Sequence, residues 1–252
     1  MRTPPVIAKP SGYRMNPRIG VVLVAHGSRD PRAAEHTEAL ARAVADAHPE
    51  WAVHASYLDH AGPRPLDVLR WLALSGHDRV VVVPLLLTAA YHGKVDIPAM
   101  LDEASELPMD IRLADVLGQA SVLLVDALIR RLPETGVDAL VLSAAGTRDA
   151  AARATVEQVA DALGARLGVP CAVAYASAAP PMAGDAVRAC GPVRVGVASY
   201  FLAPGLLYDK AVVSARSAGA VAVAPPLGDA PELVDLIGDR VSSVLPARVR
   251  AA

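Results

Sequence analysis

The chain has 252 residues, of which 53% are hydrophobic and 20% are charged, and its formal net charge is −2. This composition excludes general disorder and leaves room for one large α/β domain or two domains of about 120 residues each. The near-neutral charge and the aromatic content of only 4% argue against a nucleic-acid partner.

The N-terminal residues 1–18 contain four prolines and no apolar segment of the signal-peptide type, so we expect a flexible tail. The longest apolar run, Val80–Ala90, is interrupted by Pro84 and is too short to span a membrane. Cys171 and Cys190 are the only cysteines, which indicates no disulfide framework, and both are expected as small buried hydrophobic side chains. A cytoplasmic protein without a membrane partner is therefore expected.

Apolar strands alternate with amphipathic helices through residues 19–134. Strands are predicted at Ile19–Ala25, Ala52–Leu58, Arg79–Leu86 and Asp110–Ala114, and helices at Pro31–Ala47, Pro65–Leu74, Asp96–Glu106 and Ala120–Leu132. Strands that are apolar on both faces and alternate with helices form parallel sheets with helices on both sides. Right-handed crossovers then predict a doubly wound, flavodoxin-like layer.

The same order of elements restarts after the turn residues Leu132–Gly136, over residues 135–252. Strands are predicted at Asp138–Ala144, Pro170–Tyr175, Val193–Ser199 and Ala220–Ala224, and helices at Asp149–Leu167, Gly184–Ala189, Leu206–Ala218 and Pro231–Leu245. Local identities recur as well, since Gly146-Thr147-Arg148-Asp149 follows its strand as Gly27-Ser28-Arg29-Asp30 follows the first. We infer an internal duplication, with domains at 19–134 and 135–252.

The two halves differ in their histidines. His26 follows the first strand in VVLVAHGSRD, and His92 follows the third strand in PLLLTAAYHGKVDIP. The matching residues of the second half are Ala145 and Leu207, and all seven histidines of the chain lie at or before residue 92. Any chemistry that these imidazoles perform therefore belongs to the first half, and the second half contributes shape.

Both histidines follow carboxyl ends of predicted strands, which is where open α/β sheets bind ligands. Imidazole exchanges protons near neutral pH and is a good ligand for Fe, Co, Ni and Zn. Two such groups in one cleft can hold a divalent metal ion and accept a proton, and insertion of a metal into a macrocycle needs both acts. Ser28, Arg29 and Lys94 flank them, at helix starts that favour the carboxylates of a polyanionic substrate.

These motifs resemble those of the class II chelatases that act on sirohydrochlorin. The resemblance is carried by His-Gly-Ser-Arg after the first strand, by the Pro-Leu-Leu-Leu-Thr segment with its Tyr-His-Gly-Lys-Val-Asp-Ile-Pro continuation, and by Leu-Gly opening the fourth helix. It runs from Ile19 to the last helix and implies two flavodoxin-like halves facing across a cleft. It also implies that His26 and His92 handle the metal and accept protons, with no organic cofactor and a degenerate second half.

One segment departs from the pattern of that family. Its members carry Glu in a Phe-Leu-Glu-like segment after the second strand, where this chain has Tyr57-Leu58-Asp59-His60. Asp59 can offset the charge of the metal as a third contact, but it reaches about one methylene less far, and His60 can compensate. Asp59 can equally be a turn residue before Gly62-Pro63.

Several alternatives stay open at this point. Arg29 and Lys94 can be solvated charges at helix starts; His36, His48 and His77 are expected on solvated faces. His54 is expected as a packed, hydrogen-bonded side chain. The expected activity is insertion of Fe²⁺ into sirohydrochlorin to give sirohaem, with Co²⁺ or Ni²⁺ as other metals. A cobaltochelatase of corrin synthesis, a non-catalytic tetrapyrrole or metal carrier and a phosphate-binding module are the alternatives. A monomer is sufficient, since one chain supplies both halves.

Overall fold

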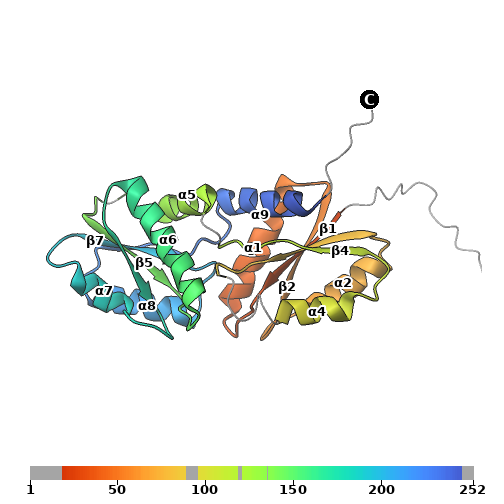
Figure 1. The fold of residues 1–252 in the computed structure, drawn as a ribbon, viewed down its shortest axis with the longest axis horizontal. Helices are drawn as coiled ribbons and strands as arrows, with labels where there is room; N and C mark the ends of the chain where they lie inside the picture. Colours follow the sequence, from red (N-terminus) through yellow and green to blue (C-terminus); the bar gives the residue numbers. More distant parts are fainter. Residues whose placement is uncertain (1–18, 89–95, 119–120, 135, 246–252) are drawn as a thin grey trace, which may run out of the picture.

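The computed structural model of the chain describes residues 19–88, 96–118, 121–134 and 136–245. These residues form two lobes side by side, each built on a four-stranded parallel sheet (Figure 1). The first sheet has the order β2-β1-β3-β4 and contains β1 (Ile19–Ala25), β2 (Trp51–Tyr57), β3 (Arg79–Pro84) and β4 (Asp110–Leu113). The second has the order β6-β5-β7-β8 and contains β5 (Ala139–Ala144), β6 (Cys171–Tyr175), β7 (Val195–Tyr200) and β8 (Ala222–Val223). The matching order confirms the α/β fold with two flavodoxin-like sheets.

Helices cover both faces of both sheets. In chain order they are α1 (Pro31–Ala47), α2 (Pro65–Leu74), α4 (Asp96–Ala104), α5 (Val122–Arg131), α6 (Ala150–Leu167), α7 (Ala183–Ala189), α8 (Leu206–Ser217) and α9 (Pro231–Val244). The central residues Val21–Val24 and Val80–Val83 are 0% exposed because helices pack against both sides of their strands. Within the described residues, no helix combines the length and the hydropathy that crossing a membrane requires.

The last helix of each half lies on the opposite lobe. α5 follows the first sheet in sequence but contacts β7 and α6 of the second, and α9 contacts β3 and α1 of the first (Figure 1). Hydrogen bonds fix this crossing: the Arg240 guanidinium donates to the Val116 carbonyl oxygen at 3.1 Å, and the Arg112 guanidinium to that of Val244 at 2.7 Å. The two lobes therefore share one continuous hydrophobic core.

Cys171 and Cys190 are free thiols that are partly rather than fully buried, and burial raises the pKa of Cys171 to about 12. Because only the thiolate reacts readily, we expect Cys171 to resist a disulfide reagent at pH 8 until the protein unfolds. The absorbance of the chromophore that the reagent releases, followed with and without denaturant, measures how many thiols react. The Cys171→Ser variant shows which part of this absorbance comes from Cys171. Rapid reaction of Cys171 in the native protein would contradict the packing described here.

Candidate active site

The turn that ends β1 places His26 beside the loop that follows β2. Gly27 has φ of +90°, and a Cβ atom on Gly27 would lie 1.8 Å from the Asp59 carbonyl oxygen. The Asp59 N–H holds the two loops together by donating to the His26 carbonyl oxygen at 2.8 Å. Glycine alone satisfies both the backbone angle and this close approach. The turn at Gly27 therefore depends on glycine both for its φ and for the close approach to Asp59.

The second lobe repeats this turn with different side chains. A Cβ atom on Gly146, which has φ of +97°, would lie 1.9 Å from the Ser177 carbonyl oxygen. The residue that follows Asp59 in the first lobe and the one that follows Ser177 in the second both have positive φ, 60° at His60 and 64° at Ala178. The polar residues of the first turn and their counterparts in the second are His26 and Ala145, Asp59 and Ser177, and His60 and Ala178. The duplicated backbone therefore carries these polar groups in one lobe and small residues in the other.

His26, Asp59 and His60 form a polar group at the end of the first sheet. The rings of His26 and His60 lie edge to face with their centroids 6.3 Å apart. The Asp59 carboxylate accepts the backbone N–H of His60 at 2.8 Å, and its other oxygen lies 3.4 Å from His60 Nε2. Asp59 thus has the turn role considered for it, and its carboxylate also faces an imidazole. His60, predicted from the sequence as a group that can compensate for the shorter Asp59, thus lies next to it.

The Asp59 carboxyl group stays ionised to a lower pH than an ordinary aspartate. Its pKa is lowered chiefly by the hydrogen bond from the His60 backbone N–H. The charges of His60, Arg64 and His26 lower this pKa further, in that order. A negative charge is therefore present beside His26 throughout the neutral range.

Ser28 and Asp30 organise the start of α1. The Ser28 hydroxyl accepts the Asp30 N–H at 3.1 Å, and the Asp30 carboxylate accepts the Arg32 N–H at 3.0 Å, so this carboxylate caps the helix. Arg32 pairs with Asp30 and reaches Asp209 of the second lobe at 2.6 Å, and its guanidinium lowers the pKa of Asp30. Arg29, which lies between Ser28 and Asp30 in the sequence, is exposed. Ser28 therefore has a structural role in addition to any contact with substrate.

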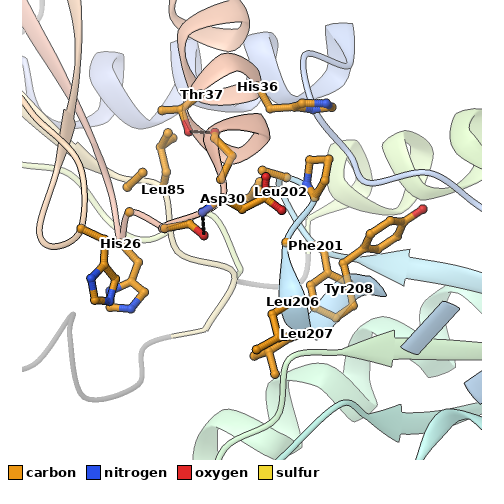
Figure 2. Close-up of a pocket in the computed structure, with 18 of the residues that line it drawn as sticks. His26, Asp30, His36, Thr37, Leu85, Phe201, Leu202, Leu206, Leu207 and Tyr208 are labelled. Atoms are coloured by element: carbon orange, nitrogen blue, oxygen red, sulfur yellow. Dashed lines mark hydrogen bonds between the residues drawn. The ribbon is translucent and has the colours of Figure 1, made fainter. Parts of the chain in front are cut away.

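A cavity of about 720 Å³ lies between the lobes at the carboxyl ends of their central strands (Figure 2). Its first-lobe side is lined by His26, Ser28, Arg29, Asp30, His36 and His60, and its second-lobe side by residues 201–209. Doubly wound sheets bind ligands at the carboxyl ends of their central strands, at the point where the strand order reverses. His26 thus faces a cavity of ligand size.

A second cavity of about 400 Å³ also includes His26. It is lined by Asp59, Asp96, Glu103 and Arg64 together with apolar residues of α2 and α4. Within the described ranges, no group of three or more His, Cys, Asp or Glu side chains has the geometry of a metal site. His26 is therefore shared by an interlobe cavity and an acidic cavity in the first lobe.

The remaining predicted residues have mixed outcomes. His92 and Lys94 lie outside the described residues, so their placement beside His26 stays a prediction. The prediction of a solvated His36 was wrong: it is half-buried and lines the interlobe cavity, because α1 turns this face toward the second lobe. His54 is packed as expected, edge to face with Trp71 at 5.0 Å, but its buried Nε2 has no hydrogen-bond partner among the described residues.

The apolar residues of the second-lobe wall were not identified from the sequence. Phe201, Leu206 and Tyr208 line the interlobe cavity, and Figure 2 shows them on the side opposite His26. The internal repeat did point to this segment, because Leu207 occupies the position in the second half that His92 occupies in the first.

Comparison with known proteins gives the family of the chain. The CbiX family model matches residues 20–135 and matches again over residues 139–244. A relative from Methanopyrus kandleri, named sirohydrochlorin cobaltochelatase, is 36% identical over 83 residues, which are 33% of this chain and 58% of that protein. One of the same name from Methanococcoides burtonii is 29% identical over 87 residues, 34% of this chain and 66% of that protein. The matches thus span less than two thirds of these relatives.

Solved structures share the fold over nearly the whole chain. SirB from Bacillus subtilis with Fe³⁺ superposes with a TM-score of 0.78 and 22% identity, over 90% of this chain and 95% of that one. CbiX, described as the terminal enzyme for biosynthesis of siroheme in denitrifying bacteria, superposes with a TM-score of 0.66 and 20% identity, over 91% and 100%. Since the family model accounts for both halves, the chain belongs to the CbiX family, the sirohydrochlorin chelatases that its histidine motifs resemble.

Proposed function

We propose that this protein inserts a divalent metal ion into sirohydrochlorin, with Fe²⁺ as the expected metal and sirohaem as the product. The observation that carries the proposal is the position of His26, directly after β1 and on the wall of the interlobe cavity. The second lobe has Ala145 at the matching position, so one lobe supplies the imidazole. Membership of the CbiX family and the names of the relatives support the same reaction.

Metal insertion exchanges the pyrrole N–H protons of the macrocycle for one cation. The site must therefore hold a cation weakly and accept protons, and imidazole does both near neutral pH. We assign these roles to His26 and to His92, its partner in the family motif. The domain assignment follows: residues 19–134 carry the reacting groups and residues 135–252 complete the cleft, so a monomer is sufficient.

The carboxylates beside His26 favour the approach of the metal. Asp59, Asp96 and Glu103 line the acidic cavity that also includes His26, and negative groups along a cavity wall raise the local concentration of cations. We propose that the metal reaches His26 from this side while the macrocycle occupies the interlobe cavity. Arg29 on the cavity wall, with Ser28 and Lys94, would pair with the peripheral carboxylates of the substrate.

The reaction is tested by mixing the purified protein with metal-free sirohydrochlorin and Fe²⁺ under anaerobic conditions. Turnover beyond one equivalent, followed in the visible spectrum, is expected of the enzyme. A spectral shift that stops at one equivalent would identify a tetrapyrrole or metal carrier instead. Absence of any tetrapyrrole binding would favour the phosphate-binding module.

Co²⁺ is the second candidate metal. The relatives from Methanopyrus kandleri and Methanococcoides burtonii are both named cobaltochelatases, and one SirB structure from Bacillus subtilis is described in complex with cobalt. Imidazole ligands serve both metals, and the intrinsic affinity order favours Co²⁺ over Fe²⁺. The ratio of kcat/KM for the two metals, measured on the same protein, decides between ferrochelatase and cobaltochelatase.

The Asp59→Asn variant is expected to raise the KM for the metal about tenfold, as removal of groups that support a metal ligand does. The KM for sirohydrochlorin should change little, because Asp59 lines the acidic cavity and not the interlobe one. Asp46→Asn on the exposed face of α1 is the matched control. An unchanged metal KM would show that Asp59 acts only as a turn residue.

A further inference from the structure

The two walls of the interlobe cavity differ in chemistry. The first-lobe wall carries imidazole and charged side chains around His26 and His60. The second-lobe wall comes from the loop after β7 and the start of α8, and its apolar residues are Phe201, Leu202, Ala203, Pro204, Leu206 and Leu207. Figure 2 shows Leu206 and Leu207 on the opposite side of the cavity from His26. A ligand between the walls would therefore meet imidazole and charged groups around His26 on one side and mainly hydrocarbon on the other, where the charged residue is Asp209, paired with Arg32.

Leu206 is the most exposed part of this apolar wall. Its exposed fraction is 74%, although it begins a helix and lines a cavity together with Phe201 and Leu207. A single exposed leucine is ordinary on a protein surface, but apolar side chains gathered in one cavity gain free energy when a ligand covers them. The wall is therefore suited to an apolar ligand surface.

Phe201 and Tyr208 hold the wall in a fixed shape. Phe201 is only 8% exposed and packs edge to face on Tyr208, with ring centroids 5.8 Å apart and planes at 73°. The Tyr208 hydroxyl donates to the Ala224 carbonyl oxygen at 3.3 Å, which anchors the ring at its far end. A surface that is already ordered loses little entropy when it binds a ligand.

The internal duplication relates this wall to the histidine positions of the first half. Leu207 stands where the first copy has His92, and Ala145 stands where it has His26. The second copy thus has hydrocarbon side chains where the first copy has imidazoles. Its wall offers contact area and no metal ligand at these two positions.

We infer that Phe201, Leu206 and Leu207 seat the face of the macrocycle that is turned away from His26, so that the metal enters through the opposite face. The inference rests on the proposed function and gives the second lobe a substrate-orienting role. A tetrapyrrole is flat and apolar on its faces and carries its carboxylates at the rim. Such a face would suit the apolar wall, and Arg29, which lines the same cavity, would be available to the carboxylates of the rim.

The test compares Leu206→Asn with Val213→Asn. Val213 lies on the same helix and is 65% exposed, but it does not line the interlobe cavity. Binding of metal-free sirohydrochlorin is measured by fluorescence titration, and steady-state kinetics give separate KM values for macrocycle and metal. Leu206→Asn is expected to weaken macrocycle binding and raise its KM about tenfold, and to leave the metal KM unchanged. Val213→Asn should match the wild type.

The outcomes separate this inference from the proposed function. If Leu206→Asn binds sirohydrochlorin as tightly as the wild type while the wild type turns over, the apolar seat is wrong and the chelatase stands. If the wild type neither binds nor metallates sirohydrochlorin, the proposed function fails and the inference fails with it. Melting curves for both variants, with Leu206→Ala as a milder replacement, distinguish lost binding from lost folding.

Discussion

Replacing His26 by alanine is expected to lower the rate of sirohydrochlorin metallation by about 10²–10⁴-fold, the range for loss of a proton-transfer group. The variant loses the imidazole that follows β1 and lines both the interlobe and the acidic cavity. His60, whose ring centroid lies 6.3 Å away, is on a different loop and does not occupy the same position. Initial rates from the visible spectrum, at saturating macrocycle, measure the effect.

The matched control is His48→Ala. His48 stacks on Trp51 with ring centroids 3.9 Å apart and does not line the interlobe cavity, so its removal should leave turnover unchanged. The His26 variant should still bind metal-free sirohydrochlorin, because the apolar wall opposite is intact. Wild-type turnover in His26→Ala would refute the role of this imidazole, whatever the macrocycle affinity.

The second large effect is expected from Gly27→Ala, which should destabilise the protein by at least about 3 kcal/mol. The added Cβ would lie 1.8 Å from the Asp59 carbonyl oxygen, and the positive φ is itself unfavourable for alanine. The loops after β1 and β2 must then separate, which moves His26 away from Asp59. For a chain of this size, the melting temperature should fall by roughly 6–12 °C.

Two other glycines separate the causes of this effect. Gly168 also has positive φ, +69°, but a Cβ there meets no atom within 4 Å, so Gly168→Ala should lose only about 1 kcal/mol. Gly146→Ala introduces the same clash in the second lobe, against Ser177 at 1.9 Å. It should destabilise as much as Gly27→Ala but retain more activity at temperatures where both are folded. Equal stability of the Gly27 and Gly168 variants would show that the clash relaxes freely.

The local elements could be predicted because their signals lie close together in the sequence. α1 begins at Pro31 as predicted, since Asp30 caps the helix and proline fits its first turn. β1 has the predicted bounds because its residues Val21–Val24 form an uninterrupted apolar run. β3 ends at Pro84, before the predicted Leu86, although the Leu85 N–H still donates to the Val24 carbonyl oxygen. Strand ends depend on where the partner strand turns away, which the apolar run does not show.

Features that depend on the meeting of the lobes could not be predicted in this way. The apolar stripe of α5 predicts a packed helix, but it has no mark of which sheet the helix covers. His36 was assigned to solvent because its own helix gives it a mainly polar setting, and only the second lobe makes that face a cavity wall. The role of an exposed leucine such as Leu206 cannot be predicted from its local sequence either, because that role depends on which residues lie across the cavity.

The crossing of α5 and α9 makes the halves of this chain inseparable as folding units. A fragment ending near Pro133 would leave the α9-covered face of its sheet open to water and would carry α5 without the strands it covers. The effects of substitutions are coupled in the same way, since α9 carries the buried Leu233 and Ile237 near the C-terminus and contacts β3 and α1 of the first lobe. Sequence neighbourhood is consequently a poor guide to which lobe a mutation weakens.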